Sequence, residues 1–158
     1  MRLFSAIAEE KLAGLPLIRL RRSLDWRSIR ESVAFLYDEI NARKGGQNPY
    51  DPLCMARVLL LQKWHGLSDP KTEIALIVRV DFALFAGLED DTPDATTISR
   101  FRTRLKKAGK LEELFQLAER SITSTGWQVI PTADAIRNIR LKKCHPVSPD
   151  ILEFSSLS

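Results

Sequence analysis

Apolar residues recur at helical spacing over most of the chain. In the segment 25–45 an apolar residue returns every three or four positions, the spacing of a helix with one buried face. The segment 52–65 differs, because its centre, Val58-Leu59-Leu60-Leu61, is apolar on every side, which is typical of a helix surrounded by protein. Helical periods also occupy 69–80, 94–108 and 111–125. The pattern predicts an all-α fold, a bundle of about five helices.

Capping and turn-forming residues mark where several of these helices begin and end. They stand at Asp25, Pro52, Gly66 and Asp69-Pro70. The segment 74–80 is rich in β-branched residues, which would also suit a strand. We assign it to a helix because both of its flanks are helical.

The chain divides into three parts by the strength of this pattern. Residues 1–24 hold a weak apolar spacing followed by a glycine, a proline and a basic run, and we predict a flexible N-terminal arm made of a short helix and a basic linker. Residues 25–126 form the helical domain. Residues 127–158 lose the helical period, and Pro131 argues against a central strand there, so we predict an irregular tail.

Positive charge is concentrated in one predicted helix. The net charge is +4, and the segment 94–110 holds six basic residues and one acidic residue, so this segment carries +5 and the rest of the chain −1. Ile98, Phe101, Leu105 and Ala108 have the spacing of its buried face. The cations on its other sides are Arg100, Arg102, Arg104, Lys106 and Lys107. They are either an ordinary cationic surface or DNA-binding residues that contact a phosphate backbone.

The remaining composition argues against several other classes of protein. Cys54 and Cys144 make no disulfide framework, and Cys144-His145 lacks the second pair that a zinc site needs, so we expect no bound metal or cofactor. Charged residues interrupt the apolar runs, and none resembles a membrane span or a signal peptide. We expect a cytoplasmic protein with no membrane partner.

Five short motifs follow one another in the chain. They are Tyr50-x-Pro52, Leu59-Leu60-Leu61-Gln62, His65-Gly66-Leu67-Ser68-Asp69, Phe85-Ala86-Gly87-Leu88 and Pro93-Asp94-x-x-Thr97-Ile98-x-Arg100-Phe101-Arg102. In this order they resemble the N-terminal helical domain of DDE transposases of the insertion-sequence-five group, over residues 25–126. The resemblance implies DNA binding in the transposition of an insertion sequence, with terminal inverted repeats as the DNA. We expect binding through the helix 96–107, aided by Arg19, Arg21 and Arg22.

The resemblance does not extend to a catalytic site. Transposases of this kind are similar to RNase H-like nucleases, in which three carboxylates hold two magnesium ions. Asp134 is the only candidate for the first carboxylate, but it follows Pro131 rather than a smooth apolar run, and no threonine follows Ala135. A surface residue is the better interpretation of Asp134. We therefore expect a truncated transposase without activity of its own, with magnesium needed only by a full-length relative.

Two further interpretations stay open. The domain is alternatively a helical protein-interaction module, which dimerises with itself or pairs with an intact transposase. It is otherwise a nonfunctional transposase relic that folds without a selected partner. The composition is compatible with each of these.

Overall fold

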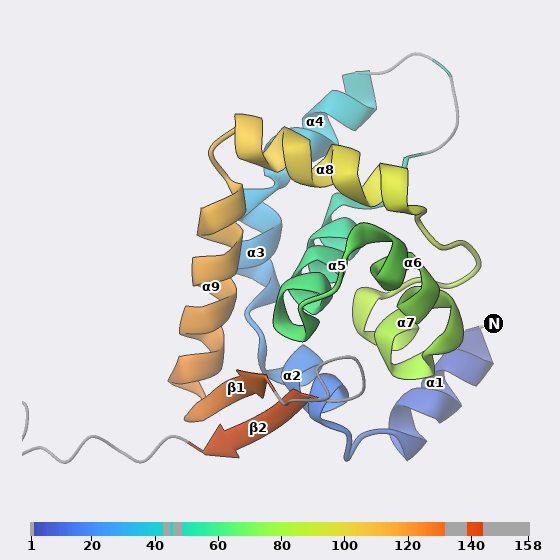
Figure 1. Cartoon of the computed structure of the whole chain (residues 1–158), viewed down its shortest axis with the longest axis vertical. Coiled ribbons are helices and arrows are strands. Elements are labelled where there is room, and N and C mark those ends of the chain that lie inside the picture. The colour runs from blue at the N-terminus through green and yellow to red at the C-terminus, as the bar shows by residue number, and fades with distance from the viewer. Residues whose placement is uncertain (1, 43–44, 46–48, 132–138, 144–158) are drawn as a thin grey trace, which may run out of the picture.

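The computed structural model describes residues 2–42, 45, 49–131 and 139–143, and these residues form nine helices and one pair of strands (Figure 1). The helices are α1 (Arg2–Lys11), α2 (Pro16–Ser23), α3 (Trp26–Ser32), α4 (Ala34–Ala42), α5 (Pro52–His65), α6 (Asp69–Val78), α7 (Val80–Ala86), α8 (Ala95–Lys107) and α9 (Leu111–Ser124). The strands are β1 (Trp127–Pro131) and β2 (Ile139–Lys143). The all-α prediction is confirmed, although the helices are shorter and more numerous than the expected five.

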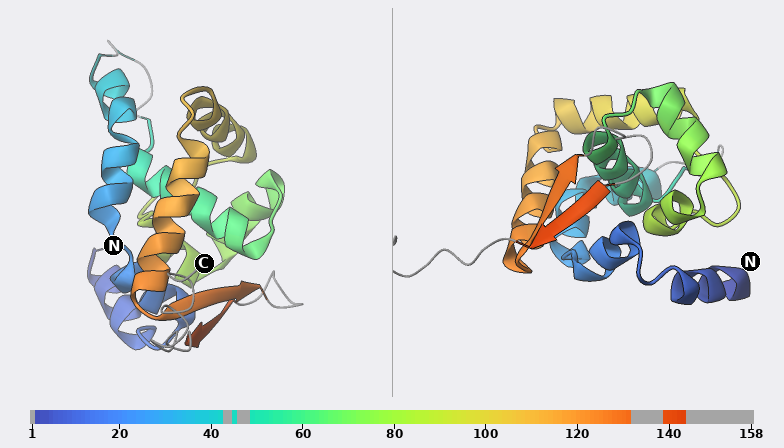
Figure 2. Two further views of the ribbon diagram at one scale, coloured as in Figure 1. Left: turned by 90° about the vertical axis from the view of Figure 1, so that its left-hand side faces the viewer. Right: turned by 60° about the horizontal axis from the view of Figure 1, so that its bottom comes forward.

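Helix α5 lies at the centre of the fold. It contacts α3, α4, α6, α7, α8 and α9, which are arranged around it (Figure 2). The run Val58-Leu59-Leu60-Leu61 is fully buried, so the segment that is apolar on every side is also covered on every side. The helix ends at Gly66, whose φ of 60° lies in the left-handed region that glycine adopts without strain. The predicted central helix is confirmed.

The first predicted helix is two helices in the structure, α3 and α4. At the break the Val33 N–H donates to the Arg30 carbonyl at 3.2 Å, and the Leu36 N–H donates to the Val33 carbonyl at 3.0 Å. The chain thus tightens to contacts between residues three apart, as in a 3₁₀ turn. Ile29, Val33 and Leu36 are buried on the two sides of this break. The apolar period therefore predicted the buried side correctly and the continuity of the helix wrongly.

The segment expected to be a flexible arm packs against the domain as helix α2. Leu17, Ile18 and Leu20 of α2 are buried. The helix contacts α7 and α9, and it lies at the end of the molecule opposite α8 (Figure 1). The predicted arm is wrong over residues 16–23, because the apolar residues that separate the arginines complete the core instead of forming a linker.

The helical assignment of the β-branched segment 74–80 is confirmed except at Arg79, which is extended (φ −110°, ψ 113°) and separates α6 from α7. The cap of α6 is Ser68, one residue before the predicted Asp69, because the Lys71 N–H donates to Ser68 Oγ at 3.4 Å. The Asp69 carboxylate is therefore available for another bond. α7 ends at Gly87, which is again left-handed with a φ of 74°.

Strands β1 and β2 pair antiparallel, with Trp127 opposite Lys143 and Pro131 opposite Ile139. The sequence allowed a strand at 127–130 but not a central one, and β1 is such a strand, whereas the strand at 139–143 was not predicted. Pro131 is the last residue of β1, in a two-stranded sheet whose strands are both edges, and an edge is where a strand tolerates proline. Residues 132–138 and 144–158 lie outside the described part of the chain.

Candidate nucleic-acid interface

One face of helix α8 packs against the core. Ile98, Phe101 and Leu105 are buried as predicted, and the helix contacts α5, α6 and α9. Ala108 was predicted on the same side and is exposed instead. α8 ends at Lys107, and Ala108 is its C-cap residue.

The start of α8 is fixed by two carboxylates. The Thr97 N–H donates to Asp94 Oδ1 at 2.7 Å, which confirms Asp94 as the cap, and hydrogen bonds from Thr97 lower the pKa of Asp94. The Ala95 N–H donates to the Glu73 carboxylate of α6 at 2.8 Å. The free amides at the N-terminus of α8 are thus bonded within the domain.

Arg102, one of the five candidate DNA-binding residues, is bonded to α5 and α6. Its Nη1 donates to Asp69 Oδ1 and to Gln62 Oε1, both at 2.7 Å, and its Nη2 donates to Asp69 Oδ2 at 2.5 Å. The exposed fractions of the Arg102 and Asp69 side chains are 27% and 20%. The hydrogen bonds between them lower the pKa of Asp69 and raise that of Arg102. Arg102 therefore joins α8 to α5 and α6. The N–H groups that it uses for these bonds are the ones that a phosphate contact would need.

Arg104 reaches the other flank of α8. Its guanidinium hydrogen-bonds to the Glu39 carboxylate of α4, and the side chain remains partly exposed. Arg104 thus links α8 to α4, as Arg102 links α8 to α5 and α6. The five cations that the sequence grouped together are separated by the structure.

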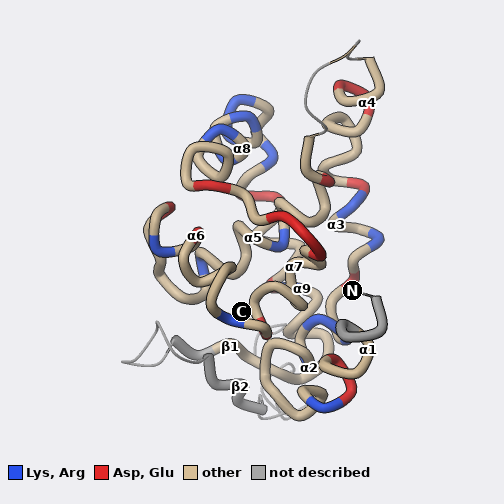
Figure 3. The backbone as a smooth tube through the Cα atoms, turned by 90° about the vertical axis from the view of Figure 1, so that its right-hand side faces the viewer, with Lys and Arg blue, Asp and Glu red and all other residues tan. Residues whose placement is uncertain are grey.

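The other three cations lie on the side of α8 that is turned away from the core. Arg100, Lys106 and Lys107 are exposed, and no ion pair joins them to an acidic residue in the described part of the chain. Thr96, Ser99 and Thr103 share that side at the i, i+3 and i+7 spacing of one helix face. We call these six residues the outer face of α8. Figure 3 shows the basic segments gathered on α8 and acidic segments in the loop that leads to it.

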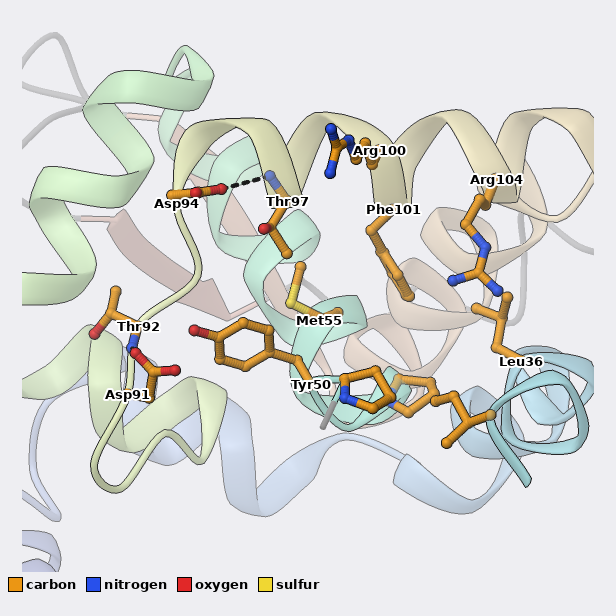
Figure 4. Close-up of a pocket in the computed structure, with 13 residues that line it drawn as sticks. Leu36, Tyr50, Met55, Asp91, Thr92, Asp94, Thr97, Arg100, Phe101 and Arg104 are labelled. Atoms are coloured by element: carbon orange, nitrogen blue, oxygen red, sulfur yellow. Dashed lines mark hydrogen bonds between the residues drawn. The ribbon is translucent and has the colours of Figure 1, made fainter. Parts of the chain in front are cut away.

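A pocket of about 530 Å³ opens beside α8, next to α4 and the loops at 49–51 and 91–94 (Figure 4). Arg100 and Arg104 line it from α8, and Tyr50, Asp91 and Asp94 line it from the loops. Burial and a hydrogen bond to Asp91 raise the pKa of Tyr50 to about 12. The pocket mixes both signs of charge and does not extend the cationic surface.

The basic run in α2 does not join the outer face of α8. The Arg19 guanidinium lies 4.7 Å from the centroid of the Trp127 ring, and Arg21 pairs with Glu9 at 2.9 Å. In Figure 1 α2 lies at the bottom of the molecule and α8 at the top. Arg19, Arg21 and Arg22 therefore do not form one surface with α8.

The candidate metal-binding residues do not form a site in the part of the chain that the structure describes. Among the described residues no group of three or more His, Cys, Asp or Glu side chains is arranged to hold a metal ion. Asp134, the candidate for a first catalytic carboxylate, lies outside the described residues, as do Cys144 and His145.

Among the helices that the structure describes, none has the length and apolar character needed to cross a membrane.

The sequence analysis missed the partners of the two fixed arginines. Gln62 is buried within an apolar run, and a buried polar side chain needs an internal partner, so its position was a usable signal. The pair between Arg104 and Glu39 has no local signal, because 65 positions separate the two residues.

Comparison with known proteins identifies a family for this chain. Residues 5–104 match the family described as Transposase domain (DUF772). No curated protein and no solved structure matches the chain. The matched residues run from α1 into α8, cover more than half of the sequence, and include Arg102 together with Gln62 and Asp69. The chain therefore belongs to the DUF772 transposase domain family, in agreement with its resemblance to the N-terminal domain of insertion-sequence transposases.

Proposed function

We propose that this transposase domain binds double-stranded DNA through the outer face of α8 in the transposition of an insertion sequence. The observation that supports this most is the exposure of Arg100, Lys106 and Lys107 on one helix, without an ion pair to a described carboxylate. Cations of this kind displace the counterions of DNA when they meet phosphates, and that release supplies much of the affinity.

The outer face also has suitable dimensions. α8 has 13 residues, so its length is about 20 Å, and the major groove of B-DNA admits one α-helix. Arg100 offers a fork of donors that suits a phosphate or a guanine edge, whereas Lys106 and Lys107 suit phosphates. The hydroxyl residues between them add hydrogen-bonding groups for phosphate or base edges. Arg100 is therefore the residue to which we assign base recognition.

Arg102 and Arg104 support the same function indirectly. Arg102 holds α8 to α5 and α6, and Arg104 holds it to α4, on the opposite flank. A helix that is fixed before binding loses less conformational freedom when it meets its ligand. We assign a positioning role to these two arginines and phosphate contacts to the three exposed cations.

The terminal inverted repeats of the element are the DNA that we propose as the target, on the basis of the family. Fluorescence anisotropy on a labelled duplex carrying the repeat, with a scrambled duplex for comparison, tests this target. We expect tighter binding to the repeat, and we expect Arg100→Ala to reduce that preference. Equal binding to both duplexes would contradict recognition of the repeat and leave a general affinity for DNA.

The placement of the interface is tested by removing its three cations. At about 50 mM salt, the triple variant of Arg100→Ala, Lys106→Ala and Lys107→Ala should bind DNA about tenfold to a hundredfold more weakly. Its matched control is the triple variant of Lys11→Ala, Arg27→Ala and Arg120→Ala, which removes the same charge from exposed positions on α1, α3 and α9.

The control should lose less than about threefold in affinity, and both variants should unfold within about 0.5 kcal/mol of the wild type. Equal losses of affinity in the two variants would mean that binding follows net charge. The outer face of α8 would then not be the interface.

A further inference from the structure

An apolar patch lies on the surface of α6 and at the start of α7. Its members are Ile74, Ile77, Val78 and Val80, with exposed fractions of 58%, 64%, 69% and 48%. Among the residues whose burial is described, the only other large apolar side chains that are exposed are Ile7 and Leu15. A single exposed aliphatic residue is ordinary, whereas several adjacent ones mark a contact site. We call the four residues the α6 patch.

The patch follows from the two sides of α6. Thr72 and Leu76 face the core and are buried, whereas Ile74, Ile77 and Val78 stand at i, i+3 and i+4 and form a stripe on the opposite side. The hydrogen bonds to α8 come from Glu73 and Asp69, which are not members of the stripe.

Charge is nearly absent from the stripe. Lys71 stands one turn before Ile74 and is exposed. The nearby charged side chains are bonded within the fold, since Glu73 accepts the Ala95 N–H and Arg79 pairs with Asp81 at 2.7 Å. The surface is thus an aliphatic stripe with one cation at its N-terminal end.

We propose that the α6 patch binds the α6 patch of a second copy of this chain, with the two α6 helices antiparallel. An interface around a two-fold axis places the same residues of the two copies opposite one another, so the patch must be complementary to itself. An aliphatic stripe meets this condition because it holds no charge that would face its own copy at the axis.

The position of Lys71 selects the antiparallel arrangement. In that arrangement Lys71 of each copy lies beside the last carbonyls of the other α6, near Val78, where the helix dipole favours a cation. A parallel arrangement would instead place the two lysines next to each other. The charge of the patch therefore complements an antiparallel second copy.

The size of the patch predicts a reversible dimer. Four aliphatic side chains at these exposures present on the order of 400 Å² per copy, about half of what each partner contributes to a standard stable interface. The association should therefore depend on concentration, with a dissociation constant on the order of tens of micromolar. This proposal is independent of DNA binding and is tested without DNA.

The experiment is sedimentation equilibrium of the full chain from about 5 to about 500 µM, a range that spans the expected dissociation constant. We expect the mean mass to rise from monomer towards dimer for the wild type, and to stay at the monomer for Ile77→Glu. Ile7→Glu is the matched control, because it places the same charge at an exposed isoleucine on α1. Circular dichroism confirms that both variants keep the wild-type helix content.

A wild type that stays monomeric to 500 µM would overturn the proposal and leave the patch to a different protein. Self-association of Ile77→Glu at the wild-type level would overturn the proposal as well. The same would follow if the Ile7→Glu control lost as much self-association as Ile77→Glu. The antiparallel orientation is tested by the variant Lys71→Glu. Its dissociation constant for the dimer should rise about threefold to thirtyfold, because the substitution occurs twice in each dimer. An unchanged dissociation constant in this variant would overturn the antiparallel arrangement.

Discussion

Helices α6 and α8 lie side by side and are joined to each other by hydrogen bonds (Figure 1). Their solvent-exposed residues nevertheless differ in character, because those of α8 are basic and those of α6 are apolar. The Arg102 guanidinium of α8 binds the Asp69 carboxylate of α6, and both helices bury an apolar side. Outward, α8 carries Arg100 and two lysines, whereas α6 carries an aliphatic stripe. Inner contacts therefore fix where a helix lies in this fold, and the binding roles that we propose rest on the outer residues, which packing leaves unconstrained.

The largest effect is expected when the bond between the two helices is removed. Arg102→Ala should lower the free energy of unfolding by about 1–3 kcal/mol, because it leaves the partly buried Asp69 without its cation. Urea unfolding followed by circular dichroism measures this loss. Arg27→Ala is the control, since Arg27 is 89% exposed in its pair with Glu31. The control should lose less than about 0.5 kcal/mol, and an equally small loss in Arg102→Ala would show that the pair does not hold the helices together.

A smaller effect is expected from pH. Hydrogen bonds from Arg102 hold the pKa of Asp69 below its ordinary value of 3.8. Asp69 therefore stabilises the folded state above that value, and this contribution is lost as the pH falls through the lowered pKa. The difference in unfolding free energy between the wild type and Arg102→Ala should stay constant from about pH 7 to pH 5 and shrink below about pH 4. Other carboxylates titrate equally in both proteins, so a difference that persists to pH 2 would show that the pair does not act through charge.

The parts of the fold that the sequence predicts are those with a local cause. The cap at Asp25, the left-handed glycine at Gly66 and the buried run of α5 each follow from a few adjacent residues. Helix α2 also had a local signal, because Leu17, Leu20 and Leu24 recur at helical spacing and all three are buried. The basic residues between them led us to predict an arm instead.

The division of the α8 cations into fixed and exposed ones has no local cause. Arg102 and Asp69 are 33 positions apart, and Arg104 and Glu39 are 65 apart. Only the folded chain brings each pair together, so sequence reasoning assigned all five cations to DNA alike. The α6 patch was hidden for a related reason, because the apolar residues of 74–80 all looked suitable for the core until the structure showed which side of α6 is covered.

The central claim is that three cations of α8, rather than five, are presented to DNA, and the salt dependence of DNA binding tests it most directly. Each neutralised phosphate contributes about −0.9 to the slope of log affinity against log salt, so the outer face of α8 predicts a slope of about −2.7 for the wild type. The triple variant of Arg100, Lys106 and Lys107 should bring the slope close to zero. A wild-type slope of about −4.5, with most of it retained in the triple variant, would contradict the claim, because phosphates would then be bound mainly by other cations.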